Sequence, residues 1–557
     1  MFDGALAATV ASGLSTEYPS RVPGTPEAAN AARWYSERIS ALGLQSEEDS
    51  WRADLPGLGD SDLRNVVTAI PGRSQETIVV VAHRDNRGAG QPFGDNASGT
   101  AALIEIARGY AAQETAPAPL PQRTLVLVST DGGAYGGAGA ARFAESPHVE
   151  RALAAIVLDG LGGRGRPRIA VAGNRSSSPA RTLVGTASAR VEEHVGEAPA
   201  LPGAVTQLVD LGIPYASGEQ GSLLARGVAT ITLTTDEQGD PDVPAGDSAA
   251  PLAIVTLGSF GRASEAIIAS IDRSVGSAFR TQDRVFLEER AASGWTIRLA
   301  LIVAVVPFAL GVFDLLVRSR RRRLPFAPAV RALRTRALLC LYAGLLLWIG
   351  TLVDVFPTGA SLPPPPYSSI VGNWSLPGTA LLVVAFLLGW LVSHRRLVPA
   401  SQPSAEERLA GYAVALGWIA LVAVAVALAH PYALIFVLPS LYAWLWLPLR
   451  NRFWTRAAVY VAGLSGPAGA VLVLGHELGL GVIDTLLYLV GLATVGYLTF
   501  TSVLLALAWT AGASQLAALA FGRYAPDVRG DEHRSGLFRN TVAYFAERRA
   551  GDDQMDK

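Results

Sequence analysis

The sequence predicts an α/β N-terminal domain, with a mostly parallel sheet flanked by helices, followed by an all-α domain that crosses a membrane several times. Up to about residue 275, short apolar runs alternate with amphipathic helical segments, and charges occur throughout. From Trp295 to Phe521, long apolar stretches dominate. The chain has 557 residues, too many for one ordinary domain, and its mean hydropathy is +0.30. Two different domains are therefore expected.

The N-terminal half shows the order of elements typical of a parallel sheet. A turn and then an amphipathic helix are expected within Arg21–Gly43, and another helix over Thr100–Ala112. Strands are expected at Asn65–Ile70, Thr77–Ala82, Arg123–Thr130, Ala154–Leu158 and Val228–Leu233. Because parallel strands place their carboxyl ends at one edge of the sheet, a binding site is expected at that edge.

The C-terminal half contains seven apolar stretches that approach or exceed the length of about 20 residues needed to cross a bilayer. They are Thr296–Val317, Ala337–Phe356, Pro377–Val392, Leu409–Ala429, Tyr432–Leu449, Ala457–Leu474 and Val482–Trp509. The loop Arg318–Arg336 carries eight arginines, whereas Pro357–Ser375 carries no Lys or Arg. Since basic loops stay in the cytoplasm, the C-terminus is expected to be cytoplasmic and the N-terminal domain extracytoplasmic.

These observations divide the chain into four parts. We expect an N-terminal domain at 1–275, a linker at 276–295, a transmembrane domain of about seven helices at 296–521 and a cytoplasmic tail at 522–557. Export of a large domain requires a signal, and Met1–Ser20 has no basic start followed by an apolar run. We therefore expect a signal-anchor helix upstream of Met1.

Composition excludes several function classes. The net charge of -1 gives no basis for binding nucleic acid. The single cysteine, Cys340, excludes an internal disulfide and a cysteine metal cluster. The sequence contains neither a Gly-x-Ser-x-Gly nucleophile turn nor a Walker-type phosphate loop. The partners expected are the lipid bilayer and a peptide or protein ligand of the exported domain.

Four polar side chains fall at or just after predicted strand ends: His83, Asp95, Asp131 and Asp159. Taken singly, an Asp-Asn pair at a helix start is usually an N-cap, and Asp-Gly is usually a turn. In this order, however, one imidazole and several carboxylates meet at one sheet edge, and zinc binds nitrogen and oxygen ligands of this kind. Asp85 is expected to hold the second nitrogen of the His83 imidazole.

The same residues carry a resemblance to a known family. His83-x-Asp85, followed by Asp-Asn-x-Ser-Gly starting at Asp95, closely resembles the signature of metallopeptidase family twenty-eight, the aminopeptidase Y type of two-zinc exopeptidase. The segment Arg-x-Pro-Gly-Thr starting at Arg21 is similar to that family's opening. The resemblance covers about Leu6–Ile271, and it implies a zinc-exopeptidase-like fold for the N-terminal domain.

The resemblance also implies roles for single residues. Asp95 would contact both zinc ions, and His83 and Asp159 would complete the first zinc site. The general base and one ligand of the second zinc would be two adjacent glutamates after a later strand. This chain has Gly133 at the position of the base and Ala134 at the position of the ligand, so no catalytic residue is retained there.

The remaining ligand of the second zinc, a late histidine, is missing as well. No histidine lies between His194 and His394, and Asp236 is the candidate substitute ligand in the expected region. A positioned general base typically contributes roughly 10²–10⁴-fold in rate, and a second Lewis acid adds several kcal/mol of charge stabilisation. The losses therefore predict weak or absent peptide hydrolysis.

Three hypotheses remain open. The first is a membrane-anchored pseudo-peptidase that binds a peptide or protein, with one zinc ion or none. The second is an active zinc aminopeptidase in which a carboxylate such as Asp236 or Glu219 replaces what is missing. The third is a transporter or membrane scaffold whose helices carry the function.

Overall fold

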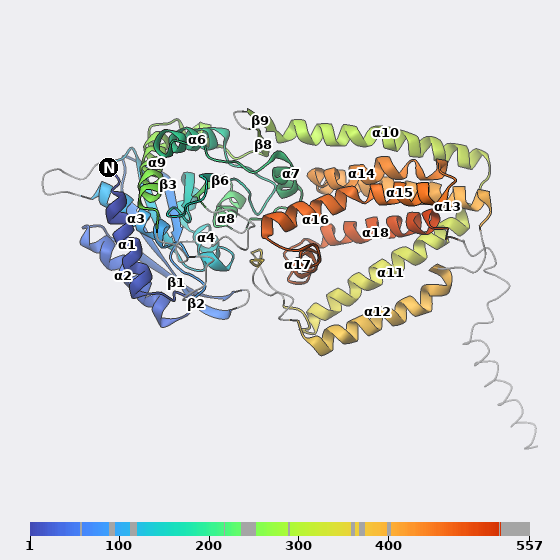
Figure 1. The fold of residues 1–557 in the computed structure, drawn as a ribbon, viewed down its shortest axis with the longest axis horizontal. Helices are drawn as coiled ribbons and strands as arrows, with labels where there is room; N and C mark the ends of the chain where they lie inside the picture. Colours follow the sequence, from blue (N-terminus) through green and yellow to red (C-terminus); the bar gives the residue numbers. More distant parts are fainter. Residues whose placement is uncertain are drawn as a thin grey trace, which may run out of the picture.

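The structure is a computed structural model in which an α/β domain and a helical domain lie at opposite ends of the long axis (Figure 1). It describes residues 1–55, 58–88, 95–111, 120–216, 218–235, 252–287, 290–357, 362–366, 374–397, 403–522 and 524. The predicted fold class, an α/β domain with a mostly parallel core sheet followed by apolar helices, is confirmed.

A seven-stranded sheet forms the centre of the N-terminal domain, in the order β1-β2-β4-β3-β5-β7-β6. The strands are β1 Glu47–Leu55, β2 Gly59–Ile70, β3 Ser74–His83, β4 Arg123–Thr130, β5 Ala152–Leu158, β6 Arg168–Ala170 and β7 Ala229–Thr234. The four central strands β4, β3, β5 and β7 run parallel, and β1, β2 and β6 add antiparallel pairs at the edges. All five predicted strands are present, whereas β1 and β6 were not expected.

Helices cover both faces of this sheet. They are α1 Gly4–Glu17, α2 Pro26–Ala41, α3 Ala97–Tyr110, α4 Ala138–Phe143, α5 Pro147–Glu150, α6 Arg181–Val195, α7 Ala204–Gly212, α8 Gln220–Ala225 and α9 Ile254–Asp272, with the 3-10 turns η1 Gly133–Tyr135 and η2 Gly276–Phe279. Along β3, Ile78 and Val80 join the core formed with α1, α2, α3, α6 and α9. The alternate residues Val79 and Val81 pack with α4, α5 and α8. This alternation is the period of two that a strand imposes, and it gives a three-layer α/β/α domain.

The segment expected as a linker has its own structure. After η2, the strands β8 Arg284–Leu287 and β9 Arg290–Ser293 form a two-stranded sheet that leads directly into the first long helix. Asp283, just before β8, forms an ion pair with Arg298 and accepts a hydrogen bond of 3.1 Å from the hydroxyl of Tyr432. The connection is therefore anchored to the helical domain by polar contacts.

The helical domain contains α10 Gly294–Arg321, α11 Phe326–Leu352, α12 Leu376–Leu397, α13 Ala405–Ala429, η4 Pro431–Ala433, α14 Leu434–Trp444, η5 Leu447–Leu449, α15 Phe453–Gly463, α16 Ser465–Leu478, α17 Val482–Thr494 and α18 Phe500–Ala520. Among the described residues, seven helices are long and apolar enough to cross a membrane. One of them is α9, which is 56% buried and belongs to the core of the α/β domain. The other six lie in the helical domain, together with the pair α15 and α16, which is bent by 44°.

The expected seventh stretch, Val482–Trp509, is wrong as a single helix. The chain forms α17, breaks, and then forms α18, which continues to Ala520. Gly496 lies in the break with a φ of 87°, a backbone conformation that glycine adopts readily. A hydropathy window does not register this change of direction, because the residues around the break are as apolar as the helices.

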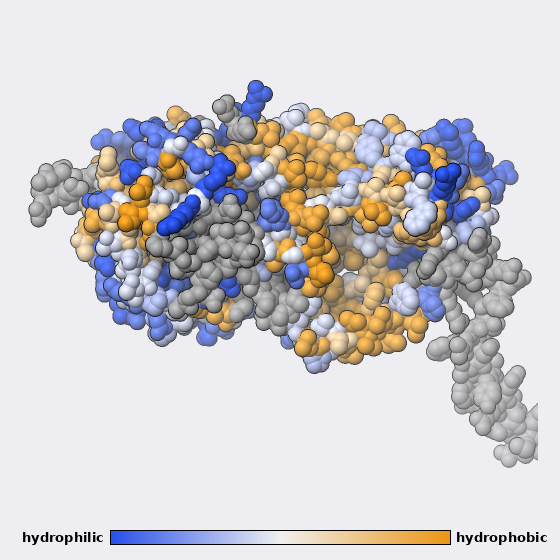
Figure 2. All heavy atoms as spheres, viewed as in Figure 1, coloured by the Kyte–Doolittle hydropathy of each residue, from blue (hydrophilic) through white to orange (hydrophobic). Residues whose placement is uncertain are grey.

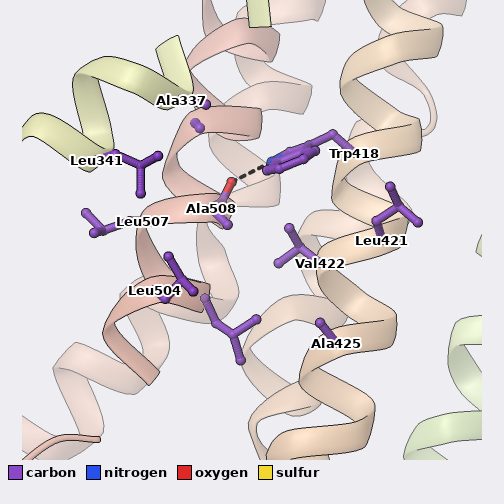
Figure 3. Close-up of a pocket in the computed structure, with 11 residues that line it drawn as sticks. Ala337, Leu341, Trp418, Leu421, Val422, Ala425, Leu504, Leu507 and Ala508 are labelled. Carbon is purple, nitrogen blue, oxygen red and sulfur yellow. Dashed lines mark hydrogen bonds between the residues drawn. The ribbon is translucent and has the colours of Figure 1, made fainter. Parts of the chain in front are cut away.

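Hydrophobic residues cover much of the helical domain on the face shown in Figure 2, and hydrophilic residues gather at the end farthest from the α/β domain. An apolar groove of about 310 Å³ lies among α11, α13 and α18. Its only hydrogen bond drawn in Figure 3 joins the indole nitrogen of Trp418 to the carbonyl oxygen of Ala508, at 2.8 Å. The helical domain therefore has an apolar surface, consistent with a membrane protein.

One buried arginine connects the sheet to the last helix of the α/β domain. Arg123, at the start of β4, donates from its guanidinium to the carbonyl oxygens of Ile271, Asp272 and Ser274, and its Nε donates to Glu76. These carbonyls lie in and just after the last turn of α9, where a helix has no partners of its own for them. The guanidinium therefore serves as the C-terminal cap of α9.

We predict that Arg123→Met lowers the free energy of unfolding of the α/β domain by about 2–4 kcal/mol, because it leaves buried carbonyl oxygens without donors. Pulse proteolysis of the full-length protein in urea measures the change. The exposed Arg151, changed to Met, is the control and should alter stability by less than about 0.5 kcal/mol. Equal effects of the two variants would contradict the capping role.

Candidate functional site

The carboxyl ends of the parallel strands bring the predicted site residues to one edge of the sheet. His83 is the last residue of β3 and pairs in register with Thr130, the last residue of β4. Asp159 directly follows β5, the neighbour of β3 on its other side. Asp95 lies two residues before α3, whose Thr100 hydroxyl donates to the carbonyl oxygen of His83. The predicted gathering of these residues follows from the strand order.

His83 is buried between two carboxylates. Its Nδ1 lies 3.4 Å from Oδ1 of Asp85, and its Nε2 lies 3.4 Å from Oδ1 of Asp159. Nδ1 is also 3.2 Å from the carbonyl oxygen of Asp85. Burial by itself lowers the pKa of His83, but hydrogen bonds to Asp159 and Asp85 raise it well above the ordinary value of histidine. Asp85 therefore lies beside Nδ1 of the imidazole, the contact that the sequence predicted.

The carboxylate of Asp85 has a second set of partners, which the sequence did not indicate. Its Oδ1 accepts a hydrogen bond of 2.8 Å from the amide of Gly133, and its Oδ2 accepts one of 3.0 Å from the amide of Ala134. These amides begin η1, where a short helical turn leaves its first N–H groups unpaired. Asp85 therefore connects the end of β3 to the turn that follows β4.

This connection holds Gly133 directly against His83. A Cβ atom added to Gly133 would lie less than 3.0 Å from Cβ, Cγ and Cδ2 of His83. The position implied for the general base therefore has no space for a side chain in this arrangement. Ala134, at the position implied for a metal ligand, is buried and has only a methyl group.

Asp95, the residue implied to bridge two metal ions, has an arginine as its charged partner. Arg21 forms an ion pair with Oδ1 of Asp95, and both side chains are buried. The same guanidinium donates to the carbonyl oxygens of Arg84 and Tyr18, at 2.7 and 2.6 Å. Arg21 opens the Arg-x-Pro-Gly-Thr segment, which was the only sequence signal for this contact.

Asn96 explains why the Asp-Asn-x-Ser-Gly segment is an element of the fold. Its side-chain oxygen accepts hydrogen bonds of 3.0 Å from the amides of Gly99 and Gly160, and its amide group donates to the carbonyl oxygen of Leu158 at 2.7 Å. It is therefore the N-cap of α3 and also holds the end of β5. Ser98 adds a contact of its hydroxyl oxygen with the amide of Gly162, at 3.1 Å.

A second buried ion pair lies beneath the turn. Arg84, the residue after β3, lies 3.6 Å from Oδ2 of Asp131 and donates to Ser129 and Arg64. Asp131 also accepts hydrogen bonds from the amides of Arg64 and Gly132. Burial raises the pKa of Asp131 to about 6, against the opposing effect of Arg84. These contacts indicate a structural role for Asp131.

Glu219, one of the two carboxylates considered as substitutes, lies beside the turn. It is only 2% exposed, its Oε1 accepts a hydrogen bond from the Thr130 hydroxyl, and its Oε2 has no hydrogen-bond partner among the described residues. A Cβ atom added to Gly137 would contact the Cα and Cγ of Glu219 at 3.4 and 3.8 Å. Burial raises the pKa of Glu219 to about 7, opposed by His83 and by the Thr130 hydrogen bond. The other substitute, Asp236, lies outside the described residues.

The described side chains do not fit a complete zinc site. His83 Nε2 and Asp159 Oδ1 are 3.4 Å apart, close to the roughly 3.3 Å between two ligands of a tetrahedral zinc with bonds of about 2.0–2.1 Å. The third implied ligand, Asp95, is instead paired with Arg21. In the ranges that the structure describes, no three His, Cys, Asp or Glu side chains form a group that could hold a metal ion.

Comparisons with known proteins agree with this fold. Residues 65–212 match the sequence model of peptidase family M28. The solved structures that are similar include a glutaminyl cyclase of Porphyromonas gingivalis (16% identity, 48% of this chain and 98% of that one, TM-score 0.40). They also include a leucine aminopeptidase precursor of Bacteroides thetaiotaomicron (20%, 48% and 97%, 0.39) and a zinc aminopeptidase of Bacillus subtilis (11%, 50% and 98%, 0.39). No curated protein sequence matches. The α/β domain has an M28 metallopeptidase-like fold.

We predict that Gly133→Ala lowers the free energy of unfolding by about 1–3 kcal/mol, because the new methyl group must displace the His83 ring or the turn. The measurement is again proteolysis of the full-length protein in urea. The matched control is Gly185→Ala within α6, where a Cβ atom meets nothing within 4 Å and should stabilise by about 0.5–1 kcal/mol. If Gly133→Ala leaves the free energy of unfolding unchanged, the turn does not lie against His83.

Proposed function

From an M28 metallopeptidase-like fold, we propose that this chain is a membrane-anchored pseudo-peptidase whose α/β domain binds a peptide or protein without hydrolysing it. The observation that carries the proposal is the close contact between the turn and His83, which leaves no space for a side chain at Gly133. A hydrolase of this kind needs a base within hydrogen-bond reach of a water, and the methyl group of Ala134 and the hydrogen of Gly133 provide none.

The charge arrangement supports binding over hydrolysis. Arg21 neutralises the buried carboxylate of Asp95, so the positive charge that metal ions would supply there is provided by the protein. Asp159 is the exposed carboxylate of the group, with 39% of its side chain accessible. It is therefore the group best placed to receive the ammonium of a peptide N-terminus.

The helical domain supplies the anchor in this proposal. Its apolar helices and lipid-like surface support a multi-pass protein of the cell membrane. The alternation of basic and uncharged loops supports an extracytoplasmic α/β domain and a cytoplasmic C-terminus. His83 and Asp159 are the two side chains that remain as ligands for zinc, in a site that holds one ion or none.

We predict that purified full-length protein, assayed with aminoacyl p-nitroanilides and added zinc, turns over no faster than its His83→Ala variant. Zinc content after dialysis should stay below one ion per chain, because a tetrahedral protein site needs at least three protein ligands. Absorbance at the nitroaniline wavelength and elemental analysis provide the two readouts. Zinc-dependent turnover that His83→Ala abolishes would overturn the proposal.

A second candidate is an active zinc aminopeptidase in which Glu219 is the general base. It is favoured by one specific observation: Glu219 is held by Thr130, the register partner of His83, and keeps one carboxylate oxygen without a partner among the described residues. Against it, Glu219 is almost completely buried, so no water reaches it without movement of the turn.

The isosteric variant Glu219→Gln separates the two candidates. If Glu219 is the base, turnover should fall by at least about 100-fold. If the chain is a pseudo-peptidase, neither the wild type nor the variant turns over substrate, and the substitution changes only the pH dependence of the free energy of unfolding. The pKa of this carboxyl is raised from 4.5 to about 7 on folding, so the wild type loses stability as pH rises through that window, and the Gln variant lacks this loss. Urea unfolding between pH 4.5 and pH 8 measures it.

A further inference from the structure

A short proline segment of the helical domain packs onto the turn that occupies the place of the catalytic acids. Leu362 and the prolines that follow it, residues 362–366, belong to the connection between α11 and α12, and we call them the proline strap. Leu362 packs against the small apolar cluster of Leu55, Leu63 and Ala138, which lies on β1, β2 and the start of α4. Pro363, Pro364 and Pro365 are buried. The strap is therefore packed as an interior element.

The strap lies against Gly136, three residues after Gly133. A Cβ atom added to Gly136 would lie 3.0 Å from the carbonyl oxygen of Pro363, 3.8 Å from Cδ of Pro365 and 3.9 Å from Cβ of Leu362. Gly136 also has a φ of 88°, so a side chain is excluded both by conformation and by the strap. The backbone of the strap lies directly on the backbone of the turn.

The other side of the strap is held by α17. The hydroxyl of Tyr488 donates to the carbonyl oxygen of Pro364 and lies 3.0 Å from the hydroxyl of Tyr215 in the α/β domain. The rings of Tyr488 and Tyr215 meet edge to face with their centroids 6.1 Å apart, and both are buried. Tyr497 adds a hydrogen bond of 2.8 Å to the carbonyl oxygen of Pro214. The strap thus lies between the turn and a helix of the membrane anchor.

These contacts form a continuous path from the strap to the site. The strap lies against Gly136, Asp85 accepts hydrogen bonds from Gly133 and Ala134 of the same turn, and a Cβ atom added to Gly137 would meet Glu219. We infer that the proline strap is an internal lid that keeps the turn closed against His83 and Glu219, so that the helical domain controls access to this site. The inference concerns the closed turn, and it holds whether or not the site hydrolyses peptides.

The arrangement of α11 and α12 gives this lid a means of moving. α12 packs mainly against α11, at the edge of the helical domain (Figure 1), and none of its candidate span is buried in protein. In lipid, where no hydrophobic effect drives helices together, such a helix is held mainly by its packing against that one neighbour. Residues 362–366 lie between α11 and α12 in the sequence, so a shift of α12 is the movement that we expect to displace the strap.

Disulfide trapping tests the contact itself. Ala138→Cys with Leu362→Cys, in a Cys340→Ser background, replaces two side chains of the same apolar cluster, and a disulfide between them requires Cβ atoms about 3.5–4.5 Å apart. Mild oxidation of the full-length protein in membranes should cross-link more than half of the chains. Gly185→Cys with Leu362→Cys is the control and should not cross-link. Equal cross-linking of the two pairs, or none in either, would overturn the contact.

Hydrogen exchange of the full-length protein tests the lid. In Leu362→Asp, the amides of residues 132–138 should exchange at least ten-fold faster, while those of α3 stay unchanged. Tyr488→Phe removes the hydroxyl contacts of the strap and should accelerate the same amides about five-fold, the effect of one hydrogen bond. Tyr442→Phe, whose hydroxyl donates to Ala304 inside the helical domain, is the control.

Each outcome of the exchange measurement decides the inference. Acceleration confined to the turn in Leu362→Asp and Tyr488→Phe supports the lid. No acceleration in either variant overturns it. Acceleration spread equally over α3 and the turn also overturns it, because the strap would then support the whole domain and not the site.

Discussion

The carboxylate of Asp85 is the contact on which the rest of the site depends. It receives two backbone amides at the start of η1 and lies beside the imidazole of His83. Charge-assisted hydrogen bonds from backbone amides to a buried carboxylate are among the stronger interactions in a protein. Because they join the end of β3 to the turn after β4, the turn must lie flat on His83. The missing side chain at Gly133 and the contact surface at Gly136 both follow from this position.

The second constraint is charge. A buried carboxylate is stable only when a cation or several donors compensate it. Arg21 and Arg84 provide that compensation for Asp95 and Asp131, and each guanidinium is further held by backbone carbonyls. The site is therefore balanced by fixed protein charges. A metal ion that approached Asp95 would have to displace an arginine that donates to Asp95 and to two backbone carbonyls. Of the three implied ligands, His83 and Asp159 lie close together, whereas Asp95 has this other partner.

Local sequence pattern predicted the strands and helices well where each element buries an apolar face. The predicted strand Arg123–Thr130 matches β4, because its central run of Leu and Val is buried between two neighbouring strands. β1 was missed because it is an edge strand whose residues, starting at Glu47, are largely exposed and charged. The break at Gly496 was missed because hydropathy does not encode direction. At the site, the positions of His83 and Asp159 at the ends of neighbouring strands were sufficient to bring them together. The ion pair of Asp95 with Arg21 and the hydrogen bonds of Asp85 with the turn are set by tertiary packing that sequence spacing does not reveal.

The turn after β4 determines both which chemical groups the site contains and which parts of the chain contact it. Gly133 and Ala134 carry no carboxylate. Because Gly133 and Gly136 have no side chains, His83 can approach the turn from one side and the proline strap from the other. A side chain at either Gly133 or Gly136 would separate the layers that now touch. Gly133 and Gly136 have no side chain, and this permits the close contact between the turn and the helical domain. A closed turn limits the entry of water to His83 more than it limits the binding of a ligand at the accessible carboxylate of Asp159. The contact would therefore suit a domain that binds a ligand and does not need to admit water.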